Sequence, residues 1–269
     1  MSNFRPIAAF TPRSEQGDSP AATPVSGPGR AGLPAPHTAT HPGSSPVSPL
    51  RPQVRRYRIR TLDARGDITE SFQLAPALPL FEEAFSAFAR GSTVETDMGP
   101  MAVEDLLPGD RVMTRDGGAM EIRWIGSTIY VPGHASHKAR NLHLTRIMAD
   151  SFGLARPSTC LLTGPAARLL QGGSEGMLTP VQGFVDGISV IETAPPAPVE
   201  LFHMCLARHA VIRVGGMEFE TYHPGADAAR RVGQSLRPAF MALFPGIGGL
   251  EDFGRPAYKR APFGLAEAV

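Results

Sequence analysis

The chain has 269 residues, of which 42% are hydrophobic and 7% aromatic, with 29 glycines and 27 prolines. This composition supports a hydrophobic core, but it is typical of a turn-rich protein and argues against a helical bundle. The net charge of +1 gives no reason to expect long-range attraction to nucleic acid or to an anionic membrane surface.

The cysteine count and the hydropathy pattern limit the possible classes further. Cys160 and Cys205 are too few for a disulfide framework or a four-thiolate zinc site, and both lie in apolar runs where a buried thiol is expected. No run approaches the roughly 18 apolar residues that span a bilayer, and the N-terminus lacks the apolar core of a secretory signal. We therefore expect no membrane span and a cytoplasmic protein, with export by another signal as the alternative.

The first part of the chain is a tail followed by a short lead-in. Residues 13–56 consist mostly of Pro, Ser, Ala, Gly and Thr, which bury too little apolar surface to offset chain entropy, so we predict that residues 1–56 are disordered. Alternation from Tyr57 to Leu62 predicts an edge strand. Helical spacing then predicts a short helix that carries Leu80, Phe81, Ala84, Phe85 and Phe88, so residues 57–84 form the lead-in.

From Thr93 onward the pattern changes to short strands separated by turn residues. Turns are predicted at residues 97–100, at 106–110, and at Asp116-Gly117-Gly118, where a hairpin joins two strands. Further β segments follow up to the predicted hairpin turn at Gly215-Gly216. After His223 an amphipathic helix is predicted, broken at Pro238 and ended at Pro245, and residues 246–269 are predicted to be a loose tail.

One long stretch resembles a known family. Residues 87–118, AFARGSTVETDMGPMAVEDLLPGDRVMTRDGG, resemble the first block of Hint domains of the bacterial hedgehog/intein type. The matching features are Phe88, Gly91, the Val103-Glu104-Asp105-Leu106 run and Pro108-Gly109-Asp110, in that order and at the family's spacing. The segments 123–127 and 201–225 resemble later strands of the same family. The resemblance implies an all-β Hint fold, a horseshoe with short peripheral helices, over residues 85–245.

The resemblance also implies where the family's nucleophile would stand. In active members a Cys opens the first block, and its thiolate attacks the preceding carbonyl in an N-to-S acyl shift. The alignment places Ala87 at that position, and alanine carries no nucleophile. Ser86 is the neighbouring hydroxyl, but a shift of one residue would aim it elsewhere, because near-attack geometry tolerates little displacement.

Two further elements of the family's chemistry are altered. The Thr or Ser followed by His that polarises the scissile peptide corresponds to Thr163 and the residues after it, where Ala167 stands at the position of the His. The C-terminal His-Asn pair of inteins has no counterpart in the final GLAEAV, so splicing is not expected. Thr163 is then interpreted as an ordinary strand-end or turn residue.

Several histidines remain as candidates. His209 falls where the family keeps a late-strand His, and it could act as an acid or base, although a hydrogen-bonded strand histidine is the interpretation that we favour. His203 and His223 accompany it. The spacing of His134, His137 and His143 suggests zinc, but with no Cys nearby and no carboxylate before Asp150 we expect solvated loop histidines and no metal site.

The sequence therefore supports two hypotheses about function. The first is a catalytically inactive Hint-fold scaffold that binds a protein or peptide partner. The second is a slow autoproteolytic or acyl-shift protein that uses Ser86, Ser92 or Thr93 with His209. Neither hypothesis involves a cofactor, because the phosphate-binding and dinucleotide-binding glycine motifs are missing from the sequence.

Overall fold

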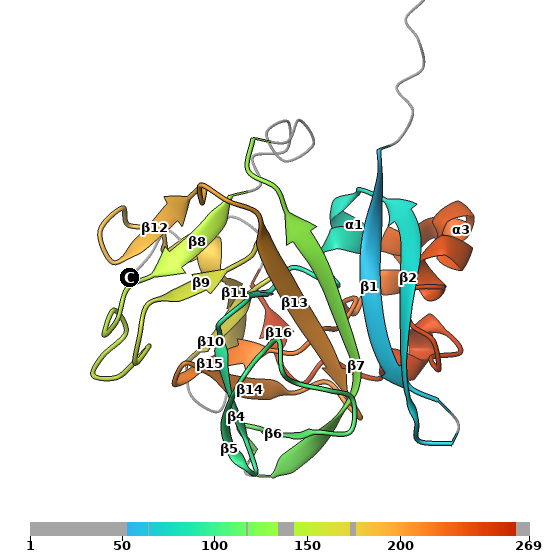
Figure 1. The fold of residues 1–269 in the computed structure, drawn as a ribbon, viewed down its shortest axis with the longest axis horizontal. Coiled ribbons are helices and arrows are strands. Elements are labelled where there is room, and N and C mark those ends of the chain that lie inside the picture. Colours follow the sequence, from blue (N-terminus) through green and yellow to red (C-terminus); the bar gives the residue numbers. More distant parts are fainter. Residues whose placement is uncertain (1–52, 64, 117, 134–142, 173–175, 262–269) are drawn as a thin grey trace, which may run out of the picture. The chain divides into compact units, whose positions relative to one another are not determined.

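The structure is a computed structural model that describes residues 53–261 apart from 64, 117, 134–142 and 173–175 (Figure 1). The predicted disordered tail of residues 1–56 thus lies largely outside the described residues, and only its last residues are seen. These belong to the fold, because the first strand already starts at Val54.

The described residues begin with a β-hairpin, of which the sequence predicted only the first strand. Strand β1 (Val54–Leu62) pairs antiparallel with β2 (Ile68–Pro76) on one side and with β7 on the other, so β1 is not the edge strand that we expected. We did not predict β2. Its outward residues Ile68, Phe72 and Leu74 are exposed, so its apolar residues do not mark a buried face.

The predicted helix of the lead-in is much shorter than its apolar spacing suggested. Helix α1 covers only Pro79–Glu82, and Phe88 lies instead in β3 (Phe88–Ala89). Phe88 pairs with Phe202 on one side and Thr163 on the other, so pairing with two strands distant in sequence overrides the local helical pattern. The aromatic side chains of Phe81 and Phe85 are nevertheless fully buried.

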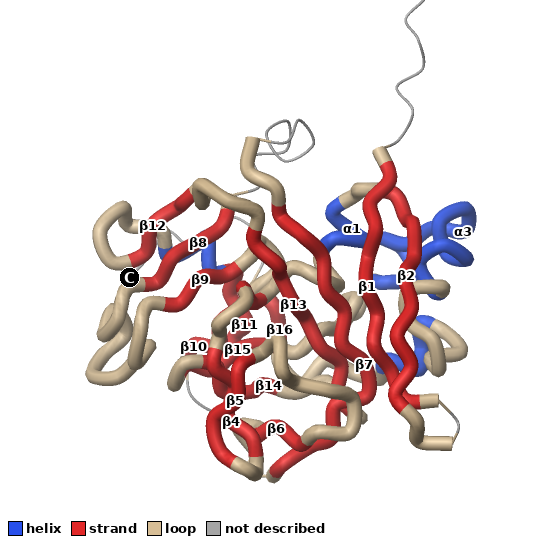
Figure 2. The backbone as a smooth tube through the Cα atoms, viewed as in Figure 1, coloured by secondary structure: helices blue, strands red, loops and turns tan. Residues whose placement is uncertain are grey.

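The β-meander after Gly91 is confirmed. Strand β4 (Thr93–Thr96) turns back into β5 (Gly99–Ala102), and β6 (Arg111–Met113) forms a hairpin with β7 (Ala119–Tyr130). The 12-residue β7 pairs with β6 near its start and with β1 and β13 further along, so it connects the two parts of the sheet system (Figure 2).

The described part of the chain between residues 144 and 220 adds eight more strands. They are β8 (Leu144–Ile147), β9 (Leu161–Thr163), β10 (Arg168–Gln171), β11 (Met177–Pro180), β12 (Val190–Thr193), β13 (Val199–Leu206), β14 (Val211–Val214) and β15 (Met217–Glu220). A 3-10 turn, η2 (Val181–Phe184), follows β11. Gly215 and Gly216 both have positive φ between β14 and β15, which confirms the predicted hairpin turn.

The C-terminal region differs from its prediction in two ways. Helix α3 (Ala228–Met241) is interrupted at Gly233, whose φ of 59° and ψ of 163° are not helical, whereas Pro238 stays inside the helix about one turn later. The residues beyond Pro245 are not a loose tail up to residue 261. They form the 3-10 turn η3 (Leu250–Phe253) and strand β16 (Lys259–Arg260), which pairs parallel with β11. No described helix is long and apolar enough to cross a membrane.

Two buried clusters hold these elements together. The larger fills the space between strands and includes Phe88, Phe202 and Phe219. The second is aromatic and joins the lead-in to α3: the Trp124 ring lies 5.4 Å from the Phe85 ring and 4.9 Å from the Phe244 ring, and its Nε1 donates to the Leu243 carbonyl at 2.8 Å. The segment before residue 85 is therefore packed into the same core as the rest of the described fold.

This aromatic cluster leads to a first prediction. A Cβ at Gly126 would lie 2.2 Å from the Trp124 ring and 2.5 Å from the Phe85 ring, so Gly126→Ala should lower the free energy of unfolding by about 1–3 kcal/mol through overpacking. Urea denaturation measures this change. Gly118→Ala is the matched control, because nothing lies within 4 Å of the added methyl group there. Equal stability of the two variants would contradict the packing.

Candidate functional site

Ala87, which the resemblance places at the position of the nucleophile, is enclosed by hydrogen-bonded backbone on both sides. Its N–H donates to the Phe202 carbonyl at 3.0 Å, and its own carbonyl accepts from the N–H of Gly164 at 2.8 Å. The side chain is fully buried. The peptide bond between Ser86 and Ala87 is thus fixed between β13 and the loop that follows β9.

The groups around this peptide bond are already engaged. The Ser86 carbonyl accepts from the Ala166 N–H at 3.0 Å, and the Ser86 hydroxyl donates to the Glu82 carbonyl at 2.8 Å. A Cβ at Gly164 would lie 2.2 Å from the Ser86 carbonyl oxygen, so glycine is needed for this close approach. The Ser86 hydroxyl therefore completes a turn at the end of α1.

Thr163 and Ala167 lie at the two ends of the loop that packs on this bond. Thr163 is fully buried, pairs with Phe88, and donates from its hydroxyl to the Thr145 carbonyl at 3.2 Å. Ala167 is 2% exposed and donates its N–H to the Gly164 carbonyl. The fold thus brings together the two segments that the sequence named, but with a methyl group at each of the two positions expected for the nucleophile and the His.

The other candidate hydroxyls lie beyond this bond in the first block. The Ser92 hydroxyl is buried and donates to the Ala89 carbonyl at 2.7 Å. Thr93 begins β4 and is exposed, paired with Ala102. Within the part of the chain that the structure describes, neither side chain forms a hydrogen bond with His209, the base named with them in the second hypothesis.

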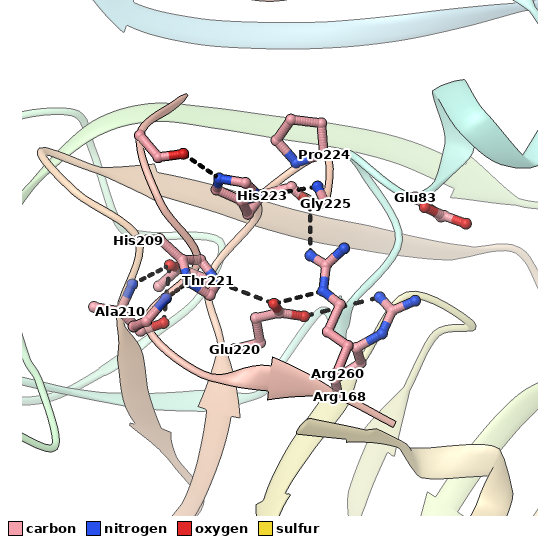
Figure 3. Close-up of polar contacts among 12 residues, drawn as sticks. Glu83, Arg168, His209, Ala210, Glu220, Thr221, His223, Pro224, Gly225 and Arg260 are labelled. Atoms are coloured by element: carbon pink, nitrogen blue, oxygen red, sulfur yellow. Dashed lines mark hydrogen bonds and ion pairs between the residues drawn. The ribbon is translucent and has the colours of Figure 1, made fainter. Parts of the chain in front are cut away.

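His209 occupies a buried polar cluster of its own. Its Nδ1 accepts from the Ala257 N–H at 2.8 Å, so the neutral ring carries its proton on Nε2, which lies 2.9 Å from Glu220 Oε1 (Figure 3). The sequence offered no acidic partner just before this His, since Ala207 stands two positions earlier. Glu220 comes from the far end of β15, and no pattern in the sequence singled it out. It shares a strand face with the more exposed Glu218, so alternation alone does not mark it as buried.

Glu220 is the centre of this cluster. Its Oε1 accepts from Arg260 Nε at 2.8 Å, and its Oε2 lies 3.8 Å from Arg168 Nη1. Burial would raise the pKa of this carboxyl, but the His209 hydrogen bond and the two guanidinium charges lower it to about 2. A buried carboxylate is therefore kept ionised by partners from three separate elements (Figure 3).

Two more histidines lie near this cluster and are held neutral. His223 Nδ1 accepts from the Gly225 N–H at 2.9 Å, and its Nε2 donates to the Gly254 carbonyl at 3.1 Å; burial lowers its pKa to about 4. The His203 ring packs edge-on against Phe88 and Tyr222, and burial lowers its pKa to about 3. Nδ1 of His203 has no hydrogen-bond partner within the described residues.

The remaining candidate ligands do not assemble in the part of the chain that the structure describes. His143 Nδ1 lies 3.7 Å from Glu192, whereas His134 and His137 lie outside the described residues. No group of three or more His, Cys, Asp or Glu side chains that could hold a metal occurs among those described. Cys205 is buried, but Cys160 is exposed, because it ends the loop before β9 and does not enter the strand.

Comparison with known proteins identifies the family of this chain. The family model of the Hint domain matches residues 86–226, which is more than half of the chain, and the chain belongs to this family. Two crystal structures of the MchDnaB-1 intein are similar. The first is 16% identical with a TM-score of 0.33 and covers 50% of this chain and 98% of that one; the second is 15% identical with a TM-score of 0.31, covering 51% and 100%. A search of curated proteins found no match.

The buried histidines predict an acid-sensitive fold. The pKa of His203 in the folded protein lies near 3, below the ordinary value of 6.5. As the pH falls below about 6.5, His203 is therefore protonated in the unfolded chain but stays neutral in the folded protein, which lowers the free energy of unfolding. Between pH 5.5 and 4.5 His203 should contribute about 1.4 kcal/mol of lost stability per pH unit.

Urea denaturation across this pH range measures the slope. In His203→Phe that contribution should disappear, which leaves the part due to His223 and, below about pH 4.5, the loss from Glu220 as it protonates toward its pKa near 2. Identical slopes for the variant and the unaltered protein would show that His203 is not held neutral by burial.

Proposed function

We propose that this Hint domain does not cleave its own backbone and serves as a structural and binding scaffold for a protein or peptide partner. The observation that carries the proposal is the methyl side chain of Ala87, fully buried where the family's acyl shift needs a thiol. With alanine at this position, residue 87 supplies no group that could attack the carbonyl of Ser86.

The surroundings of Ala87 support the same proposal. An acyl shift also needs a donor that polarises the scissile carbonyl and an acid for the leaving nitrogen. Here the Ala166 N–H bonds to the Ser86 carbonyl, but Ala167 stands at the family's His position, and the Ala87 nitrogen donates to Phe202. The peptide bond between Ser86 and Ala87 is therefore held by hydrogen bonds on both sides, but positions 87 and 167 lack the groups that would cleave it.

The segment that cleavage would release is itself built into the fold. Strand β1 pairs with β7 from Arg58 to Thr61, and Phe81 lies 5.9 Å from Phe240 of α3, ring to ring. In an autoprocessing protein the upstream segment must leave. Here it supplies an outer hairpin and part of the aromatic core, which fits a permanent scaffold.

The proposal predicts a single intact mass. Purified full-length protein incubated with hydroxylamine or dithiothreitol should keep its mass, because no thioester or ester forms at residue 87. Intact-mass spectrometry checks this directly. A product cleaved before any of residues 86–93 would overturn the proposal and favour the slow protein that uses Ser86, Ser92 or Thr93.

Restoring the missing groups should restore chemistry. The double variant Ala87→Cys with Ala167→His should give thiol-dependent or hydroxylamine-dependent cleavage between residues 86 and 87, detected as a new N-terminal fragment. The matched control is Ala89→Cys with Ala167→His, which places a thiol at another buried position of β3 and should stay intact. No cleavage in a folded Ala87→Cys double variant would contradict the assignment of residue 87.

A further inference from the structure

The C-terminal strap, residues 254–261, lies along an edge of the sheet. Its strand β16 runs parallel to β11, with Met177 opposite Lys259 and Leu178 opposite Arg260, and the Ala261 N–H donates to the Leu178 carbonyl at 2.9 Å. Without the strap, β11 would be the free edge of the order β15-β10-β11. A free edge offers main-chain donors and acceptors to any extended segment.

The strap alternates between inward and outward side chains. Tyr258 is partly buried against Leu170, Leu178 and Val211, and Arg260 reaches Glu220, whereas Lys259 between them is exposed. An extended segment that adds to a sheet edge and places alternate side chains in pockets is the geometry by which sheet edges recognise peptides. The strap therefore shows which side chains this edge accepts.

The pocket for Arg260 is matched to a guanidinium. Arg260 donates from Nε to Glu220 Oε1 at 2.8 Å and from Nη2 to the His223 carbonyl at 2.6 Å (Figure 3). His209 adds a main-chain contact by accepting from the N–H of Ala257. Two acceptors that take different nitrogens of one planar group favour Arg over Lys.

We propose that the β11 edge, the patch of Leu170, Leu178 and Val211, and the Glu220 carboxylate form a peptide-binding groove. It takes an extended partner segment with an aromatic residue two positions before an arginine, and the protein's own strap fills it in cis. This proposal rests on the binding role proposed above, and it specifies the chemistry of the partner segment. Cleavage is measured by mass and binding by peptide titration, so either proposal can fail alone.

The cis strap must compete with any partner. A tethered segment acts at an effective concentration in the millimolar range, so a free peptide with the same sequence should bind the unaltered protein only weakly. A strap that carries a like charge beside Glu220 should leave the groove, and the groove should then accept a peptide in trans.

The test uses full-length protein and a fluorescein-labelled peptide with the sequence of residues 255–262, RPAYKRAP. Fluorescence anisotropy should show that Arg260→Glu protein binds this peptide about tenfold or more tightly than the unaltered protein does. The same peptide with Arg260→Ala should bind the variant protein about tenfold or more weakly, because it leaves the carboxylate without its guanidinium.

Lys259→Glu is the matched control, since it makes the same charge change on the exposed neighbour and should bind the peptide as weakly as the unaltered protein. If Arg260→Glu is folded by circular dichroism but binds no better than Lys259→Glu, the proposal is wrong.

Hydrogen exchange on the unaltered protein gives a second measurement that does not depend on the folding of a variant. Millimolar peptide should speed exchange at the strap amides of Ala257 and Ala261 by displacing the strap. If the Arg260→Glu variant does not fold, this measurement alone decides the matter. Unchanged exchange at these two amides would then show that the proposed groove does not bind the peptide.

Discussion

The peptide bond between Ser86 and Ala87 is the point on which the arrangement of this domain depends. It is held from one side by β13, through Phe202, and from the other by the loop of Gly164 and Ala166. These contacts join three segments that are far apart in sequence. The close approach on the loop side requires a glycine at residue 164, because a Cβ there would lie 2.2 Å from the Ser86 carbonyl oxygen. In a Hint domain with a thiol at residue 87 the same contacts would hold a bond ready for attack, whereas here they hold it in place.

These hydrogen bonds around the Ser86–Ala87 peptide bond explain why the lead-in is packed as part of the domain. The chain reaches this bond from α1, whose carbonyl at Glu82 accepts the Ser86 hydroxyl, and α1 is preceded by the β1–β2 hairpin. The hairpin extends the sheet by pairing with β7, and the side chains of Phe81 and Phe85 enter the aromatic cluster. An intact peptide bond after Ser86 therefore keeps these buried apolar side chains covalently joined to the rest of the domain. Loss of the nucleophile and integration of the upstream segment are therefore consistent with each other.

The Glu220 cluster is the second centre of the domain, and it is electrostatic. One buried carboxylate contacts His209 in the loop just before β14, Arg168 of β10 and Arg260 of the C-terminal strap. Such a group is stable only with its partners in place, so the cluster links the ends of several strands to the strap. His209 is thereby tied to a carboxylate and a backbone amide.

The sequence by itself determined the family, the β-meander from Thr93 and the hairpins at Gly118 and Gly215-Gly216, because turn residues and alternation are local signals. It also determined which residue types stand at positions 87 and 167. Only the tertiary structure decided that Phe88 is in a strand, that β2 exists, and that residues 247–261 are packed, since strand pairing and burial come from segments distant in sequence.

The same reason separates the two parts of the site. The residues that surround Ala87 could be named from the sequence, because the family's motifs mark the segments to which they belong. The Glu220 cluster could not, because Glu220 pairs with Arg168 and Arg260, which lie 52 and 40 positions away along the chain. No local pattern marks a charged side chain as buried when its partners come from other strands.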